Sequence, residues 1–406
     1  MLLRFLLFFV HFSHIVTAFD DFGTSGKLRF SNLGYDDTIR YISKINNATS
    51  DNCECTLGPP EWFAGPNAPL SERLVAHIRG PIKLQKFAFY NVRHFVFGSD
   101  NNTFNWTQQA LFDVAPDSIS KQTINVTFLG HKGKYSPCTG RALTFIGQDA
   151  VSYSQENPDP LGFSGSVESD EEFIIFSNFP CPRSKWTGMC GYYKKGIRSY
   201  TGYEGQTKMF LFEFTMPTDN SNKTEEGILH YDEPAIWLAN ERLSRATEYY
   251  NWNNNCSCLF HGCGAYQVFA TNETNRDLMY SSVQTFQGVD RNTSRDHVLL
   301  GTVSDGQFIR PRNTTVRGGV IFDSEGNIVT FLTNNTQFHE YLSPEQVEDM
   351  LYDIPNIGKE KVLPSGTSIA PNTTSSSNGS VLVRTGGEIW KLYFTLLTTI
   401  IQFFLL

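Results

Sequence analysis

The sequence predicts an all-β protein built around a β-sandwich of jelly-roll type. Three observations predict this fold class. Many short segments alternate apolar and polar residues, turn-forming Gly, Asn, Asp and Pro separate these segments, and few stretches have helical periodicity. The chain has 406 residues, of which 40% are hydrophobic and 14% aromatic, and this is enough for the core of one large domain.

The expected strands follow one another along most of the chain. Residues 83–90, Lys-Leu-Gln-Lys-Phe-Ala-Phe-Tyr, show the alternation clearly. Two segments, Arg242–Tyr249 and Ser343–Tyr352, have helical periodicity, and Ser343-Pro-Glu-Gln is a typical helix start. The other expected strands are residues 125–129, 172–176, 207–215, 268–271, 319–322 and 327–331.

Both ends of the chain have the features of targeting signals. Residues 1–18 have the charged start, apolar run and small-residue end of a signal peptide, so we expect the mature chain to begin at Phe19. A membrane anchor is the alternative, although the apolar run is short and contains two histidines.

Residues 346–378 are expected to form a Ser/Thr/Asn-rich stalk, and residues 379–406 a GPI-attachment signal with Asn378 as the attachment site. A tail anchor is the alternative, although the last apolar run is shorter than the ~20 residues that span a bilayer.

The mature chain is expected to have a Cys-containing N-terminal region, residues 19–81, followed by the sandwich, residues 82–345.

The charge of the chain argues against nucleic acid as a partner. The net charge is −8, and no cluster of Lys and Arg is long enough to follow a phosphate backbone. We therefore do not expect nucleic acid to bind.

An even number of cysteines in a secreted chain predicts four disulfides, whose pairing the sequence does not determine. Cys181 and Cys190 are close enough to form a local loop. A zinc site built from His261 and the three cysteines around it is the alternative, which an oxidising compartment disfavours. The cysteines are Cys53, Cys55, Cys138, Cys181, Cys190, Cys256, Cys258 and Cys263.

Dense N-glycosylation sequons predict a eukaryotic secretory protein with sugar over much of its surface. We expect Asn255 to be skipped because it directly precedes Cys256, and Asn378 also lies in a sequon. The other candidate sites are Asn47, Asn101, Asn105, Asn125, Asn222, Asn272, Asn292, Asn313, Asn334 and Asn372.

One stretch, Pro234 to Gln287, organises the functional interpretation. It contains Pro-Ala-Ile-Trp-Leu, a cysteine loop and the expected strand Gly264–Ala270. In that strand Ala265 and Gln267 share a face, and a bulge after Gln267 would bring Ala270 onto the same face. A retaining glycosidase needs two carboxyl groups about 5–5.5 Å apart, and this spacing would place them. Here the residues are Ala, Gln and Ala, so the surface lacks catalytic acids.

These motifs together resemble family 16 glycoside hydrolases, and most of all the GPI-anchored fungal cell-wall proteins described as probable circularly permuted 1,3-β-glucanases. The resemblance covers about residues 27 to 340 and implies a concanavalin-like, circularly permuted sandwich. Matching pieces include Pro234-Ala-Ile-Trp-Leu, Tyr280-Ser-Ser-Val-Gln-Thr-Phe-Gln-Gly288, Phe210-Leu-Phe-Glu-Phe-Thr-Met-Pro217 and Gly318-Gly-Val-Ile-Phe-Asp323.

The resemblance also implies where the catalytic groups would stand. The family's strand has the pattern Glu-x-Asp-x-Phe-Glu, in which the first Glu is the nucleophile, the Asp orients it and the last Glu is the acid/base. Its positions fall on Ala265, Gln267 and Ala270, with Phe269 kept, and the family's His in the next strand falls on Gln284. We therefore expect no catalytic residue at these positions.

Other carboxylates of the chain do not easily take the place of the missing catalytic acids. Glu273 and Asp277 lie beyond the strand, and Glu213 is expected to be a structural acid on another strand. The resemblance implies a mechanism by carboxylates alone, so we expect neither a catalytic metal nor another cofactor.

Substrate binding can survive the loss of the acids. Trp237, Gln267, Gln284 and His261 are the expected saccharide contacts, because aromatic faces and amides recognise sugar rings and hydroxyls. The resulting hypothesis is a GPI-linked wall glycoprotein that binds β-1,3-glucan or another wall polysaccharide. An active glucanase or transglycosylase with displaced acids is the second hypothesis, and a purely structural coat or adhesion protein is the third.

Overall fold

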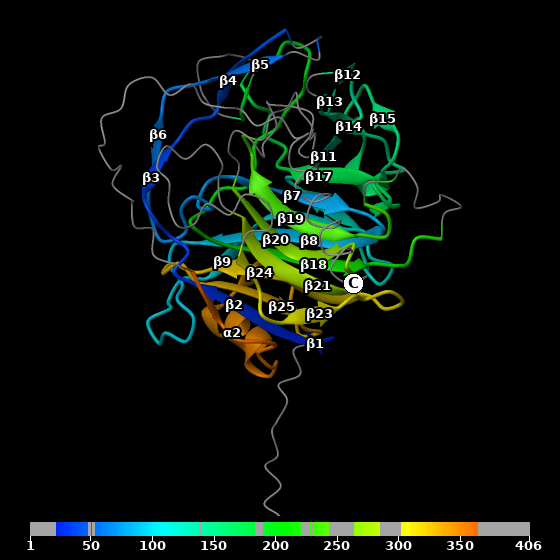
Figure 1. The fold of residues 1–406 in the computed structure, drawn as a ribbon. Coiled ribbons are helices and arrows are strands. Elements are labelled where there is room, and N and C mark those ends of the chain that lie inside the picture. The colour runs from blue at the N-terminus through cyan, green and yellow to red at the C-terminus, as the bar shows by residue number, and fades with distance from the viewer. Residues whose placement is uncertain are drawn as a thin grey trace, which may run out of the picture. The chain divides into compact units, whose positions relative to one another are not determined.

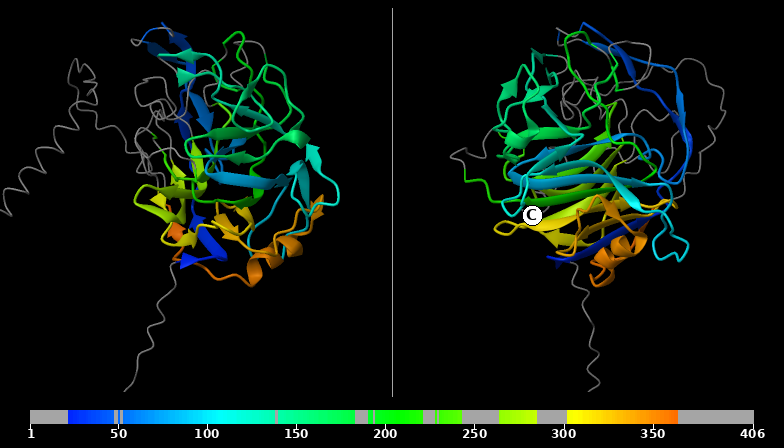
Figure 2. Two further views of the ribbon diagram at one scale, coloured as in Figure 1. Left: turned by 90° about the vertical axis from the view of Figure 1, so that its right-hand side faces the viewer. Right: turned by 180° about the vertical axis from the view of Figure 1, so that it is seen from behind.

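The computed structural model describes residues 22–47, 50, 53–137, 140–182, 190–192, 194–220, 228, 230–242, 264–284 and 302–363. These residues belong to one compact unit that is almost entirely β-structure. Two large sheets lie against each other, as Figures 1 and 2 show. The predicted all-β sandwich is confirmed.

The first sheet has 11 strands. Its order is β1 (Phe22–Gly23), β23 (Gln307–Ile309), β21 (Asn275–Gln284), β20 (Ala265–Asn272), β19 (Ala235–Asn240), β7 (Leu74–Arg79), β17 (Glu172–Phe176), β11 (Thr127–Gly130), β14 (Thr144–Ile146) and β15 (Tyr153–Ser154), with β22 (Thr302–Val303) paired to β21.

The second sheet has 10 strands. Its order is β10 (Gln122–Ile124), β9 (Trp106–Asp113), β8 (Ile82–Val92), β18 (Thr207–Thr215), β24 (Val316–Phe322), β25 (Ile328–Leu332), β2 (Gly26–Ser31) and β27 (Lys361–Val362), with β16 (Ser166–Val167) on β8 and β26 (Tyr341–Leu342) on β9.

Three small hairpin-like pairs and two short helices complete the described part. The pairs are β3 (Asp37–Ile39) with β6 (Glu61–Phe63), β4 (Ile42–Asn46) with β5 (Glu54–Leu57), and β12 (Tyr135–Ser136) with β13 (Gly140–Arg141). The helices are the 3₁₀ turn η1 (Pro160–Gly162) and α2 (Pro344–Tyr352).

The main core fills the space between the sheets because strands from both sheets send alternate side chains inward. On β18 these side chains are Phe210, Phe212 and Phe214, and on β20 they include Tyr266 and Val268. The opposite face of β18 is buried too, since its intervening residues pack with α2 in a second cluster. This double burial explains why residues 209–212 of β18 are all apolar.

Several predicted elements are confirmed. β17 and β18 have the expected bounds, residues 172–176 and 207–215. Ser343 caps α2 in a capping box with Gln346. The disulfide Cys181–Cys190 is present, and Cys53 and Cys55 are also disulfide-bonded. The expected helix Arg242–Tyr249 lies outside the described residues beyond Arg242.

The sandwich extends beyond the segment expected for it, residues 82–345. β2 and β7 come from the expected N-terminal region, yet each is a strand inside one of the large sheets. At the other end, β27 pairs with β2, so residues assigned to the stalk up to Leu363 pack on the sandwich. Within the described ranges, no helix is long and apolar enough to cross a membrane.

Candidate functional site

The expected bulge in β20 is present. Pairing between β20 and β21 shifts between Gln267 and Ala270, and pairing with β19 shifts at the same level. As a result Ala265 and Ala270 pack in one cluster with Trp237, as the spacing predicted. We call this side of strands β17, β7, β19, β20 and β21 the Trp237 face; the other side of the same strands packs into the main core.

Strand pairing arranges the Trp237 face in three rows of side chains that cross the sheet. The first row contains Glu172, Arg79, Ala235, Ala270 and Tyr280; the second contains Ile174, His77, Trp237, Gln267 and Ser282; the third contains Val75, Ala239, Ala265 and Gln284.

Small residues surround the central indole. Alanines at 235, 239, 265 and 270 form a buried cluster with Trp237 and Tyr280. The side chain of Trp237 is only 2% exposed, and Ala265 is fully buried. Trp237 therefore lies on the expected face, but its ring is packed in protein and is not an open platform for a sugar.

Two neighbours on β7 cover the indole. The ring of His77 stacks on that of Trp237 with centroids 4.9 Å apart and planes inclined by 17°. The guanidinium of Arg79 lies 5.5 Å from the centre of the indole, and its Nε donates to the carbonyl of Glu233 at 3.0 Å. A cation over an aromatic face is stabilising, and more so when both groups are desolvated.

The row that contains Arg79 also holds a carboxylate. Oε1 of Glu172 lies 2.6 Å from Nδ1 of His77, and the Glu172 side chain is 23% exposed. Burial raises the pKa of Glu172, but His77, together with the more distant Arg79, more than offsets this effect, so the pKa lies below its usual value. Glu172 is therefore ionised at neutral pH.

A second acid lies beyond the end of the first row. Nδ1 of His230 is 3.2 Å from Oε2 of Glu233, and Glu233 is buried. Asp170 is close enough to interact electrostatically with His230 and Arg79. This end of the Trp237 face is thus polar and contains groups of both charges.

On the opposite side of Trp237 the groups are neutral. Ser282 donates to Oε1 of Gln267 at 2.5 Å. Burial raises the pKa of Tyr280, whose hydroxyl also hydrogen-bonds with Gln267. Gln267 and Gln284 are both half-buried, and their amides are the neutral hydrogen-bonding groups of this side.

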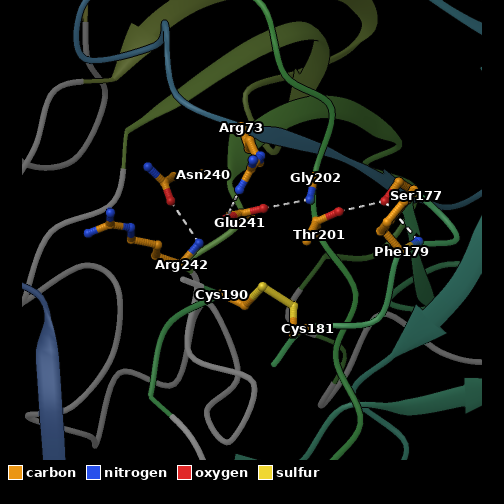
Figure 3. Close-up of a disulfide and its surroundings, with 10 residues drawn as sticks. All are labelled: Arg73, Ser177, Phe179, Cys181, Cys190, Thr201, Gly202, Asn240, Glu241 and Arg242. Carbon is orange, nitrogen blue, oxygen red and sulfur yellow. Dashed lines mark hydrogen bonds and ion pairs between the residues drawn. A yellow bond between two sulfur atoms is a disulfide. The ribbon is translucent and has the colours of Figure 1, made fainter. Parts of the chain in front are cut away.

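Glu241 follows the end of β19, and its contacts hold the fold together (Figure 3). Its carboxylate accepts from the backbone N–H of Gly202 at 2.7 Å and lies 3.6 Å from the guanidinium of Arg73. Burial raises the pKa of Glu241, while these contacts and a hydrogen bond from the backbone of Cys190 lower it. Glu241 thus ties β19 to the loop that carries the Cys181–Cys190 disulfide.

The described carboxylates do not reproduce a retaining pair at the expected positions. Glu172 is three strands from Ala270, which corresponds to about 14 Å between backbones. Glu172 and Glu241 lie opposite Arg79 and Arg73, so their backbones are about 20 Å apart along the strands. The chemistry needs about 5–5.5 Å between carboxyl groups.

Sequence reasoning did not identify His77, Arg79 or Glu172 as residues of this face. The alternation of His77 and Arg79 within β7 was the available signal, but β7 had not been assigned to the sandwich. His261 and the cysteines around it lie outside the described residues, so their roles remain predictions. Among the described residues, no group of three or more His, Cys, Asp and Glu side chains is arranged to hold a metal ion.

Comparison with known proteins identifies the family. Two family models match the chain, "Cell wall protein YJL171C/Tos1, N-terminal" over residues 26–92 and the corresponding C-terminal model over residues 104–350. No solved structure matches.

Curated relatives agree with the family models. "Probable circularly permuted 1,3-beta-glucanase YJL171C" of Saccharomyces cerevisiae is 39% identical over 93% of this chain and 92% of its own length. "Probable circularly permuted 1,3-beta-glucanase PGA52" of Candida albicans is 36% identical over 91% of this chain and 93% of its own. The S. cerevisiae protein of the same description named TOS1 is 30% identical over 62% of this chain and 50% of its own. The resemblance inferred from the motifs is confirmed, and the chain belongs to the YJL171C/Tos1 family of glucanase-like cell wall proteins.

Proposed function

We propose that this protein is a GPI-anchored cell-wall glycoprotein that keeps the glucanase-like sandwich, lacks its catalytic carboxylates and binds β-1,3-glucan in the organisation of the wall. One observation carries the proposal. Ala265, Gln267 and Ala270 lie on a common face, in the positions where the resemblance implies nucleophile, orienting acid and acid/base.

The absence of hydrolysis follows from the chemistry. Without a carboxylate at 265 no glycosyl-enzyme ester can form there, and without one at 270 the leaving oxygen receives no proton from this strand. General acid–base catalysis alone contributes about 10²–10⁴ in rate. We therefore expect turnover far below that of an active glucanase.

Glucan binding is supported by polar side chains that are only half-buried on this face. Gln267 and Gln284 offer amide donors and acceptors to sugar hydroxyls, and Glu172 adds an ionised acceptor on the same face. Trp237 lies on the same face, where its indole is packed among the alanines.

The first experiment measures retention on insoluble β-1,3-glucan and product release from laminarin oligosaccharides. The protein is secreted without residues 379–406 and compared with Gln267→Ala/Gln284→Ala. We expect glucan retention, no product, and weaker retention of the double variant. Lys121→Gln, which changes an exposed lysine elsewhere, is the matched control. Absence of retention would contradict the binding role.

A triple variant, Ala265→Glu/Gln267→Asp/Ala270→Glu, tests the catalytic assignment. Product release by this variant would show that the carboxylates are all that the strand lacks. Because residues 265 and 270 are buried, its folding must be checked by circular dichroism. If it does not fold, inactivity of the natural protein is tested directly by its rate of laminarin cleavage.

One observation favours the alternative of an active glucanase with displaced acids. Glu172 and Glu233 both lie next to Arg79, and each is paired with a histidine. If the natural protein releases product, Glu172→Gln and Glu233→Gln identify the acids, since loss of cleavage with retained glucan binding would assign them a catalytic role.

The anchor has its own test. The sequence features that support it are the stalk, Asn378 with the small residues after it, and the apolar end of the chain. We expect phosphatidylinositol-specific phospholipase C to release the protein from membranes of cells that express the full chain. Retention after treatment, with a known GPI-anchored protein released in the same sample, would contradict this attachment.

A further inference from the structure

An exposed tyrosine lies beside a glycosylation sequon on the second sheet. The side chain of Tyr341 is 56% exposed, although the residue belongs to a strand, β26, that pairs with β9. The sequon is Asn105-Trp106-Thr107, at the start of β9. The tyrosine and the sequon are far apart in the sequence, so only the fold brings them together.

Strand pairing determines which side chains share a side of this pair of strands. Leu342 is opposite Trp106, and both are buried in the cluster that includes α2. Tyr341 is opposite Thr107, so these two side chains lie on the other side, toward solvent. Asn105 is two residues before Thr107 and is exposed, as the alternation predicts. Asn105 and Tyr341 are therefore diagonal neighbours, for which the separation is about 7–8 Å.

The amide of Asn105 is available for modification. In the part of the chain that the structure describes, no group hydrogen-bonds with its side chain, whereas Nδ2 of Asn125 donates to the carbonyl of Gln109 at 3.0 Å. N-glycosylation attaches an N-acetylglucosamine to the side-chain nitrogen of the asparagine in a sequon. A glycan on Asn105 would thus begin beside the ring of Tyr341.

A second aromatic ring, that of Phe104, lies directly before the sequon and is 40% exposed. The guanidinium of Arg93 lies over it, 5.4 Å from its centre. This cation already covers one face of the Phe104 ring. Tyr341, on the same side of the strands as Asn105, is therefore the ring that we assign to the glycan.

We propose that the first N-acetylglucosamine of an N-linked glycan on Asn105 packs against the ring of Tyr341. The C–H groups of the sugar lie on the aromatic face, and the tyrosine hydroxyl remains at the wet edge of the contact. Because β26 leads directly into α2, the contact ties this strand and helix to β9. The inference rests on the expected secretory route and not on glucan binding, since none of these residues belongs to the Trp237 face.

A double-mutant cycle in urea unfolding tests the contact on the whole secreted chain. Its four forms are the natural protein, Asn105→Gln, Tyr341→Ala and the double variant. Asn105→Gln should raise the unfolding equilibrium constant about fivefold more in the natural chain than in the Tyr341→Ala background. Any effect of the new Gln side chain itself is common to both backgrounds and cancels. Tyr341→Phe, which keeps the ring, should behave as the natural chain.

Enzymatic release of the glycan from the folded protein gives a second measurement. Peptide N-glycosidase F should remove the Asn105 glycan about fivefold faster from Tyr341→Ala than from the natural chain, because the packed sugar must leave the ring before cleavage. Peptide mass spectrometry measures each site, and the glycans at the other occupied sequons should be released at unchanged rates. Absence of a glycan on Asn105, an equal effect of Asn105→Gln in both backgrounds, or an unchanged release rate at Asn105 would each overturn the proposal.

Discussion

Lys208 gives the sharpest stability prediction. Its side chain is fully buried on β18, where Nζ donates to the carbonyl of Glu72 at 2.8 Å and lies 5.8 Å from the centre of the Phe322 ring. Burial lowers the pKa of Lys208 from 10.5 to about 7, although nearby Glu72 and Glu204 oppose the shift. Complete protonation in the fold therefore costs about 5 kcal/mol relative to the unfolded chain.

The sign follows from proton binding. Between pH 7 and 10.5 the unfolded chain holds this proton and the folded chain largely does not, so the free energy of unfolding rises with pH. From pH 7 to 9.5 the contribution of Lys208 should be about 3 kcal/mol. Lys208→Met removes the titrating group at similar volume, so its unfolding free energy should lack this increase.

Urea unfolding followed by tryptophan fluorescence at several pH values between 7 and 9.5 measures the difference. Subtracting the Lys208→Met profile from that of the natural protein isolates this lysine from other titrating groups. Lys121→Met, at an exposed position, should keep the natural slope. Parallel profiles for the natural protein and Lys208→Met would refute the reasoning, since they would mean that the buried ammonium is well compensated.

Other predictions follow from packing, cross-linking and accessibility. Trp237→Ala should lower the free energy of unfolding by about 3–5 kcal/mol in urea, because the indole is buried among alanines; a loss of glucan retention with unchanged stability would contradict this. Replacing Cys181 and Cys190 together by Ser should cost about 3 kcal/mol in thermal unfolding for this short loop, and an unchanged midpoint would show that the loop is held by other contacts. Peptide mass spectrometry should find Asn125 without a glycan, because its Nδ2 already donates to the carbonyl of Gln109 at 3.0 Å; full occupancy would mean that this contact forms differently in the glycosylated protein.

Local patterns were sufficient to predict several strands, the bulge and the capped helix. β17 and β18 were predicted from short runs rich in apolar residues that turn residues separate, and α2 because Ser343-Pro-Glu-Gln is a typical helix start. A bulge after Gln267 was the condition for placing Ala270 on the face of Ala265 and Gln267, and the strand pairing has a register shift there.

Long-range pairing was not predictable from local patterns. β7 meets β17 about a hundred residues further along the chain, so nothing local connects His77 with Glu172. The strand β2 was not predicted for the same reason, because its partner β25 lies some 300 residues away in the sequence. The burial of Trp237 depends on these distant pairings, because His77 and Arg79 of β7 cover its ring.

The alanines do more than remove catalytic groups. At 265 and 270 they provide the space in which Trp237 packs. A glutamate at either position would place a carboxylate against the indole in a buried site, where an unpaired charge costs several kcal/mol. His77 and Arg79 both already contact the indole, and Glu172 already pairs with His77. A working acid pair on this strand therefore requires both the two carboxylates and a more open arrangement of Trp237, so catalytic chemistry and packing are coupled on this face.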